Sequence, residues 1–508
     1  MESRKTFREW NPQTYAQQPL TPAEVLPEDD LVFFLIELIP HLDLTPFSAY
    51  YQRETRGAPP FDVAMMATLL IYSYCVGVFS SRRIAAACER NLAFLAIIGR
   101  QRPDFRTISD FRKIHHQRFQ DLFVEVLRVA GELGMVKLGN LAVDGSKFRA
   151  NASRHKAMSY GYMKKEVERL HAEVAVLLQQ AEQTDAEQDA TLGSRRGDEL
   201  PAELKRRQER LQAIEAAMGR LEQEAKDQAE IQRRERAEAE AQRQASGKKA
   251  RGRPPRPISE TPNERAQTNF TDPTSRIMKV SNKGFDYCFN AQAMVDQAHQ
   301  IIVAAETSDA ANDKEQAVPL AEATLVNLEA AGIARPSIAV ETSAASPDPQ
   351  PAVPLAEGDP GGIERSGDDG PSPTADPTAV VALQIPLSAD NGYFSEDQVR
   401  GLEALGFDPH IATGRQKHNQ SQPSEAVGPP PAGATVKERM AHKLRTRAGR
   451  ACYALRKQIV EPVFGQIKHG RGFRQFLLRG LQKVRGEWKL VCLTHNLLKI
   501  WRYQCAQT

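Results

Sequence analysis

The sequence has few of the features that mark secreted, zinc-binding or disulfide-stabilised proteins. It contains only 6 cysteines in 508 residues, and they form no Cys-x-x-Cys pair and no zinc-finger spacing with histidines. Such cysteines are typical of reduced, mostly buried thiols in a cytosolic protein. The N-terminal stretch Met1 to Trp10 has no apolar signal core, so no export signal is expected.

Long hydrophobic runs are also scarce. The best candidate for a membrane span, Val63 to Phe79, has only about 17 residues, includes Thr, Ser and Tyr, and is soon followed by two arginines. A bilayer span needs roughly 20 apolar residues. The run is therefore predicted to be a buried core helix, and no membrane partner is expected.

Hydrophobic residues make up 41% of the chain, which excludes disorder throughout and allows several folded domains. The formal net charge of +3 hides a strong asymmetry. Residues 436–508 carry 17 Lys and Arg against 3 Glu and no Asp, a balance of +14, so the rest of the chain is about −11. The basic C-terminal end is the expected polyanion-binding surface.

Three carboxylates stand where a two-metal phosphoryl-transfer site needs them. Asp144 and Asp390 each follow an apolar, strand-like run, and Glu461 precedes Pro462, which favours a helix start. Residues at such strand and helix ends can converge on one edge of a mixed sheet, where hard oxygen ligands suit Mg²⁺. Each residue also has an ordinary explanation, since both Asp residues precede turn-forming residues and Glu is common in first helical turns.

Four sequence motifs, taken in their order along the chain, support the interpretation of these carboxylates as a metal site. They are Asp144-Gly-Ser-Lys-Phe-Arg, Asn290-Ala-Gln-Ala-Met-Val-Asp, Ala389-Asp-Asn-Gly-Tyr-Phe-Ser and Val460-Glu-Pro-Val-Phe-Gly-Gln-Ile-Lys. Together they resemble the bacterial insertion-sequence transposases of the DDE type that have a helical N-terminal domain. The resemblance implies an α+β fold, with a ribonuclease H-like mixed sheet flanked by helices, an all-helical N-terminal domain and an inserted coiled-coil arm.

The resemblance also implies an activity and its partners. Asp144, Asp390 and Glu461 would be the catalytic metal ligands for two Mg²⁺ ions, with Mn²⁺ as a substitute. The partners would be terminal inverted repeats and target DNA, bound by a homodimer or higher oligomer in the bacterial cytoplasm, at the nucleoid. Two alternatives stay open: a nuclease on the same core that cuts without joining, and a non-catalytic DNA-binding or scaffold protein derived from a transposase.

Related transposases carry a signature of Tyr, two residues, Arg, three residues, Glu, six residues and Lys. Glu461 and Lys468 keep the last spacing, and Lys468 is expected to position DNA. Tyr453 and Arg456 stand one residue too far upstream. A break in the helix before Glu461 could absorb the extra residue, which makes Tyr453 and Arg456 candidate contacts to phosphate or bases.

The basic C-terminal segment contains a second set of candidate DNA contacts. Arg471, Arg474 and Arg479 interleave with Phe473 and Phe476, a pattern that suits a groove tracking a DNA backbone and stacking on distorted bases. The alternative is a basic amphipathic helix whose phenylalanines belong to the core.

Two further groups of polar residues are candidates for weaker roles. Arg251 and Arg253, in Arg251-Gly-Arg-Pro, resemble a minor-groove AT-hook, with nonspecific phosphate binding as the alternative. Asn290 and Gln292 share one face of a predicted strand and are candidate site-lining groups.

Composition and periodicity divide the chain into eight segments. Apolar spacings of three and four predict the arm, and a stretch rich in Pro, Gly and acidic residues predicts a disordered insertion. The segments are a helical N-terminal domain for end binding or dimerisation (1–135), the first part of the core (136–159), a helical hairpin with a basic tail (160–268), more of the core (269–342), the disordered insertion (343–380), more of the core (381–415), a Pro-rich linker (416–435) and the basic helical end with the catalytic Glu (436–508).

Overall fold

The structure is a computed structural model of the chain. It describes residues 21–51, 59–99, 101–192, 202–245, 257–280, 284–341, 378–414 and 424–507. Arg251, Arg253 and almost all of the predicted disordered insertion lie outside these ranges.

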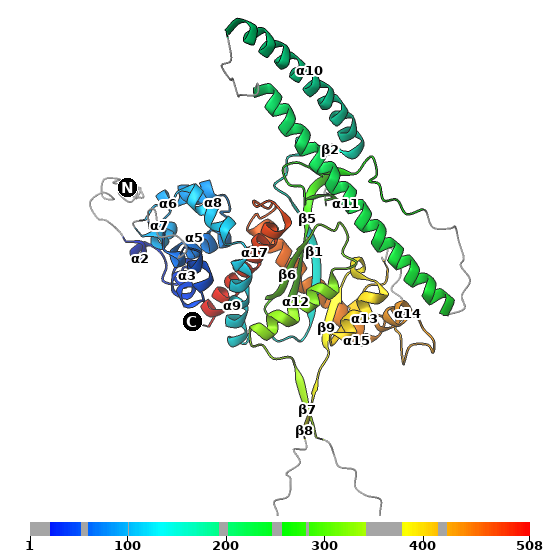
Figure 1. Cartoon of the computed structure of the whole chain (residues 1–508). Helices are drawn as coiled ribbons and strands as arrows, with labels where there is room; N and C mark the ends of the chain where they lie inside the picture. Colours follow the sequence, from blue (N-terminus) through cyan, green and yellow to red (C-terminus); the bar gives the residue numbers. More distant parts are fainter. Residues whose placement is uncertain are drawn as a thin grey trace, which may run out of the picture.

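A mixed, 6-stranded sheet forms the centre of the molecule (Figure 1). The long strand β5 pairs antiparallel with β1 on one side and with β6 and β4 on the other, and β9 and β10 extend the sheet in parallel beyond β1. The strands are β1 (Leu141–Arg149), β4 (Arg276–Lys279), β5 (Phe285–Asp296), β6 (Ile302–Ser308), β9 (Ile385–Ala389) and β10 (Phe407–Ile411). This mixed sheet flanked by helices confirms the predicted fold class.

Helices cover both faces of the sheet, which explains why its strands read as apolar runs rather than as alternating patterns. On one face, Thr324 of helix α12 (Ala317–Ala330) contacts Met294 of β5. On the other face, Trp488 of helix α17 (Leu481–Cys505) packs on Phe148 of β1. Met294 pairs with Val143, which is an odd number of residues from Phe148, so the two contacts lie on opposite faces.

The N-terminal region is helical as predicted, and its helices share one hydrophobic core with the sheet. The helix α5 is fully buried over most of its length, as expected for the run that begins at Val63. Tyr74 of α5 donates a hydrogen bond of 2.7 Å to the buried carboxylate of Glu487 in α17, and Arg112 donates to Tyr74. The helices are α2 (Pro22–Val25), α3 (Leu31–Leu38), α4 (Thr45–Tyr51), α5 (Val63–Cys75), α6 (Ser81–Arg90), α7 (Leu92–Ile98), α8 (Phe105–Ile114) and α9 (Arg118–Glu132), with a 3-10 turn at Ile39–His41.

Within the described residues, no single helix has the length and apolar character needed to cross a bilayer. Only the bent pair Leu31–His41 and Thr45–Tyr51 passes such a test, and only on length and composition.

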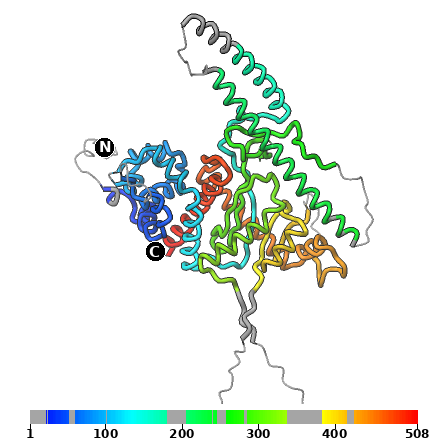
Figure 2. The backbone as a smooth tube through the Cα atoms, viewed as in Figure 1, coloured from blue at the N-terminus to red at the C-terminus, as the bar shows by residue number. Residues whose placement is uncertain are grey.

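The inserted arm is a helical hairpin that projects from the sheet (Figure 2). Its helices are α10 (Tyr160–Leu192) and α11 (Ala202–Ala245). They run antiparallel, because Glu166 pairs with Arg210 whereas Glu173 pairs with Arg207. Their apolar positions form a small cluster of their own, separate from the main core. The arm begins and ends at a two-stranded sheet of β2 (Ala157–Ser159) and β3 (Gln267–Asn269).

This separate cluster leads to a prediction about the arm. Replacing residues 162–266 by a short Gly/Ser linker should leave a folded protein, because β2 and β3 hold the two ends together and loop closure depends weakly on length. Circular dichroism and the thermal unfolding midpoint test the fold. Size-exclusion chromatography and DNA-binding assays should show weaker assembly or DNA retention. An insoluble product would mean that the arm belongs to the core. Normal assembly and transposition would show that the arm is needed neither for oligomer assembly nor for DNA retention.

The remaining elements follow the parallel strands. Helix α13 (Glu396–Ala404) connects β9 to β10, and the hairpin of β7 (Ser337–Glu341) and β8 (Thr378–Ala382) extends away from the sheet (Figure 1). The C-terminal helices before α17 are α14 (Val436–Lys443), α15 (Arg447–Ile459) and α16 (Glu461–Gly465), followed by a π-helical turn at Gln466–Gly470. Short 3-10 turns occur at Arg154–Lys156 and Asn391–Tyr393.

Candidate active site

Asp144 lies in the middle of β1, whereas the sequence analysis placed it at the end of its strand. The strand continues to Arg149 because β5 pairs with it along its whole length. The neighbouring strand β9 pairs with β1 only at Leu141 and Ala142. Between Val143 and Phe148 no described strand pairs with that side of β1, and Asp144 is the second residue after the last position paired with β9; farther on, Arg149 forms an isolated bridge with Gln475.

Asp390 follows the last residue of β9, as predicted. Its carboxylate caps the 3-10 turn Asn391–Tyr393 and accepts a hydrogen bond of 2.8 Å from the backbone N–H of Gly392. The turn-forming role considered for Asp390 is therefore real, and it fixes the carboxylate at the carboxyl end of the strand. The charges of Asp144 and Asp390 are close enough for Asp390 to raise the pKa of Asp144.

Glu461 is the first residue of α16, at a break between two helices. Helix α15 ends at Ile459, and Pro462 has no N–H with which to continue the hydrogen-bonding pattern. The carbonyl of Gln458, which that missing N–H would have reached, accepts a hydrogen bond of 2.9 Å from the side chain of Gln300 instead. The Glu461 side chain is half exposed and stands at the amino end of the helix, where a carboxylate is favoured.

Arg456 joins two of the three predicted carboxylates. Its Nη1 lies 3.6 Å from Asp144 Oδ2, and its Nη2 lies 3.4 Å from Glu461 Oε1. The guanidinium is largely buried, and its Nε atom has no hydrogen-bond partner. Although its spacing from Glu461 departs from the family signature, the helical break brings Arg456 to the site. Tyr453, one turn earlier on α15, is half-buried beside Arg456, and burial raises its pKa.

Burial and charge act in opposite directions on Asp144. Burial is the larger effect and raises the pKa of its carboxyl to about 6, and the charges of Asp390 and Asp313 add to this. Arg456 and the hydrogen bond from the backbone N–H of Gly145 favour the ionised form. A cation beside Asp144 is therefore needed to stabilise its charge, and in this structure Arg456 supplies it.

Lys468 lies beside β1 and contacts Ser146, two residues after Asp144 on the strand. Its Nζ donates hydrogen bonds to Ser146 Oγ and, at 3.0 Å, to the carbonyl of Lys147, and it stands 4.4 Å from the centre of the Phe148 ring. Burial lowers the pKa of this ammonium group. Lys468 lies within the π-helical turn Gln466–Gly470, so the segment from Glu461 to Lys468 is not one regular α-helix. Even so, Lys468 reaches the face of β1 that carries Asp144.

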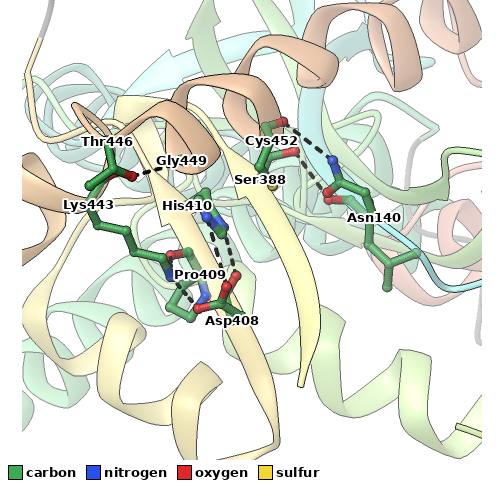
Figure 3. A network of polar contacts seen from close by, with 10 residues as sticks. Asn140, Ser388, Asp408, Pro409, His410, Lys443, Thr446, Gly449 and Cys452 are labelled. Atoms are coloured by element: carbon green, nitrogen blue, oxygen red, sulfur yellow. Dashed lines mark hydrogen bonds and ion pairs between the residues drawn. The ribbon is translucent and has the colours of Figure 1, made fainter. Parts of the chain in front are cut away.

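A polar network fixes α15, the helix that carries Arg456, to the parallel strands (Figure 3). Lys443 Nζ contacts the carboxylate of Asp408 and donates a 2.8 Å hydrogen bond to the carbonyl of Pro409 in β10. Thr446 donates to the carbonyl of Lys443 and caps α15 by accepting from Gly449. Near the next turn of α15, the side chain of Asn140 donates to the carbonyl of Cys452. The start of α15 is thereby tied to β10 and to the residue before β1.

A fourth carboxylate, Asp313, lies at this site and was missed in the sequence analysis. Helix α12 starts only at Ala317, which leaves Asp313 in the turn after β6. Asn290 and Gln292, the candidate site-lining residues of β5, both donate to Asp313 Oδ1, at 2.6 and 2.7 Å. The only signal in the sequence was an acidic residue between a strand and a helix, which is also typical of a turn former.

The basic residues after Lys468 have different environments. The guanidinium of Arg471 lies against α17, donates to Thr494 and the carbonyl of Val491, and has a pKa lowered by burial to about 10. Arg474 and Arg479 are exposed. Phe473 and Phe476 are buried against Phe148, so the expectation that they stack on DNA bases is wrong. The alternative, that they are core residues, holds because the chain here crosses over β1 and buries them.

The donor set at the site fits a magnesium centre in chemical type, since it offers carboxylate oxygens and no thiolate or imidazole. In the part of the chain that the structure describes, no three His, Cys, Asp or Glu side chains stand close enough together to hold one ion. Arg456 occupies the space between Asp144 and Glu461 that a shared cation would need. The carboxylates can therefore take up metal only if Arg456 withdraws from at least one of them.

Comparison with known families identifies both ends of the chain. Residues 424–501, which include Arg456, Glu461 and Lys468, match the family described as Transposase DDE domain. Residues 21–114 match the family described as Transposase domain (DUF772). Both matches indicate an insertion-sequence DDE transposase. No curated protein and no solved structure matches it significantly. Enzymes of the DDE family transfer phosphoryl groups on DNA and generally use divalent metal ions. The second match, to residues 21–114, lies in the helical N-terminal region.

Proposed function

We propose that this transposase binds the terminal inverted repeats of its own element as an oligomer, cuts the DNA at these ends and joins them to a target. Asp144, Asp390 and Glu461 are the proposed ligands of two Mg²⁺ ions, which Mn²⁺ can replace. The observation that carries the proposal is the convergence of these residues from β1, the end of β9 and the start of α16. Arg456 contacts two of them, and the third is close enough to perturb Asp144.

The chemistry follows from this arrangement. Bound divalent ions would activate a water or 3′-hydroxyl nucleophile and stabilise the leaving oxygen. The protein residues hold and orient the reacting groups: Lys468, fixed by Ser146 and the carbonyl of Lys147, offers a positive charge to the phosphate beside the scissile bond. Arg456, once it has released a carboxylate, and Tyr453 are proposed to contact DNA on the same side.

Two exposed basic regions support the binding of DNA. Arg474 and Arg479 stand on the surface after the π-helical turn, close to Lys468 in sequence. In the N-terminal region, Arg82, Arg106 and Lys113 line a groove of about 460 Å³ between α6 and α8. The guanidinium groups of Arg82 and Arg106 both lie over the ring of Phe105. We propose that this groove contacts the backbone of the inverted repeat.

The decisive experiment incubates the purified protein with labelled DNA that carries the flanking repeats of its element, with and without Mg²⁺. Strand cleavage followed by joining, both dependent on Mg²⁺, is the expected result. Cleavage without joining would identify a nuclease. Specific binding without cleavage in Mg²⁺ or Mn²⁺ would identify a non-catalytic DNA-binding protein.

The exposed arginines lead to a prediction about salt dependence. Changing Arg474 and Arg479 together to Gln should reduce the slope of log affinity against log salt by about 1.8, because each phosphate contact contributes about 0.9. Fluorescence anisotropy with labelled end DNA measures the slope. The matched control changes Arg335 and Arg400, two exposed arginines near α13, to Gln and should leave the slope unchanged. Equal slopes for both variants and the unaltered protein would show that Arg474 and Arg479 face away from DNA.

A further inference from the structure

Asp313 is held in a way that leaves one of its carboxylate oxygens available. Both recorded hydrogen bonds, from Asn290 and Gln292, go to Oδ1, and Lys147 Nζ is 3.7 Å from the same atom. Among the described residues, no hydrogen bond or ion pair to Oδ2 is recorded. A carboxylate fixed through one oxygen and free at the other is oriented for a ligand rather than only for structure.

The free oxygen and the carboxylate of Asp390 both lie near Gly392. A Cβ atom on Gly392 would stand 2.9 Å from Asp390 Oδ1 and 3.5 Å from Asp313 Oδ2, so two carboxylates from different elements border the same small space. The buried hydroxyl of Tyr393 also lies within the field of Asp313, Asp144 and Asp390, and these charges help burial to raise its pKa. Like charges gathered in this way repel one another unless a cation lies between them.

A buried polar atom beside Asp313 lacks a partner. Asn290 is completely buried, and its side-chain amide donates to Asp313 while its Oδ1 has no hydrogen bond. The orientation of the amide is set by Asp313, because the reverse orientation would bring two oxygens together. An unsatisfied buried carbonyl oxygen is costly. Asn290 therefore presents an unsatisfied acceptor directly beside Asp313.

Gly145 keeps the space around Asp313 open. A Cβ atom at this position would stand 2.3 Å from Gln292 Nε2 and 2.8 Å from Asp313 Oδ1, closer than real contacts allow. Gly145 pairs with Gln292 across the strands, so their side-chain positions share a face. The absence of a side chain directly after Asp144 thus lets Asp313 approach β1.

We propose that Asp313 is a fourth acidic ligand of the metal centre, binding through Oδ2 a divalent cation that it shares with Asp390. This inference rests on the proposed function, because it adds a residue to the same centre. Among the described residues, the four carboxylates of Asp144, Asp313, Asp390 and Glu461 interact with three cationic side chains, Arg456, Lys147 and Lys468. Divalent cations would balance the remaining charge. If Asp313 only accepted hydrogen bonds from Asn290 and Gln292, a neutral acceptor at position 313 would fill that role equally well.

Mn²⁺ binding tests this without relying on activity. Isothermal titration and electron paramagnetic resonance should be performed on the full-length protein, with and without end DNA. We expect Asp313→Asn, which keeps an acceptor for Asn290 and Gln292, to weaken Mn²⁺ binding by at least about tenfold. Asp397→Asn, at an exposed position of α13, is the control and should bind like the unaltered protein. Unchanged binding by Asp313→Asn would overturn the inference.

Parallel measurements on Asp144→Asn separate this inference from the proposed function. Loss of Mn²⁺ binding in Asp144→Asn together with normal binding in Asp313→Asn would leave the proposed function standing and reject Asp313 alone. Normal binding in both, or no Mn²⁺ binding by the unaltered protein in either condition, would reject the centre as a whole.

A thiol at position 313 distinguishes direct ligation from an indirect structural effect. Asp313→Cys should shift the preference from Mn²⁺ to Cd²⁺ by at least about tenfold relative to the unaltered protein, because thiolates favour soft metals. Asp397→Cys controls for Cd²⁺ binding by an added exposed thiol. A preference that moves no more in Asp313→Cys than in this control would show that Asp313 does not touch the metal.

Discussion

DNA strand cleavage is expected to fall by about a thousandfold or more when Asp144 or Asp390 is replaced by Asn, or Glu461 by Gln. Each change removes one negative charge from the proposed metal centre while keeping the size of the side chain. Affinity for end DNA should stay the same or rise slightly, because a carboxylate near the phosphates has been neutralised. Cleavage of labelled end DNA in Mg²⁺ and anisotropy in its absence measure the two quantities.

Asp397→Asn serves as the control for these variants as well, since it makes the same chemical change at an exposed position of α13. Its cleavage rate should equal that of the unaltered protein. Full cleavage by all three site variants would reject the assignment. Loss of DNA binding in parallel with cleavage would point to misfolding instead, which a thermal unfolding curve would reveal.

The stability of the protein should fall by about 2–3 kcal/mol when Gly486 is replaced by Ala. A Cβ atom on Gly486 would stand 2.0 Å from the carbonyl oxygen of His116, and backbone atoms cannot move aside as a flexible side chain can. Helix α17 would have to shift away from the turn between α8 and α9. Because α17 contacts both the N-terminal helices and the sheet, this shift would disturb the shared core.

Urea unfolding followed by circular dichroism measures this effect. Gly465→Ala is the matched control, because Gly465 is helical and a Cβ atom there would meet nothing within 4 Å. That control should be neutral or stabilising by up to about 1 kcal/mol, since Ala favours helical backbone more than Gly does. Equal stability of the two variants would show that α17 can move away from His116 at little cost.

The shared core changes how the N-terminal helices are understood. Arg112, Tyr74 and Glu487 form a buried chain of hydrogen bonds that joins α8, α5 and α17, so the helices of residues 1–135 pack directly on the C-terminal helix. Glu487 also accepts hydrogen bonds from the backbone N–H groups of Leu477 and Leu478. A contact between DNA and the groove beside α6 could therefore be transmitted to α17 through packed structure rather than through a linker.

Local sequence signals were sufficient to predict most of the helices and strands, including those that carry the candidate site residues. Apolar runs that end in Asp marked β1 and β9, and the proline after Glu461 marked the start of α16. Helical periodicity marked α10 and α11. These features depend on neighbouring residues, so a single sequence can reveal them.

Long-range packing decided the rest. Nothing near Asp313 in the chain shows that Asn290 and Gln292 will bind its carboxylate, because these residues meet only when the sheet forms and α12 packs on it. The spacing of Arg456 from Glu461 departs from the family signature by one residue, and the helical break that the sequence analysis allowed for brings the two side chains together. Phe473 and Arg471 matched a DNA-binding pattern, but Phe473 is buried in the core and Arg471 binds the carbonyl of Val491 in α17. By itself the sequence determined that Asp144 and Asp390 adjoin apolar strand segments and that Glu461 begins a helix, because hydrophobic periodicity and proline geometry are local. Only the tertiary structure decided which charges face one another, since this depends on contacts between residues far apart in the chain.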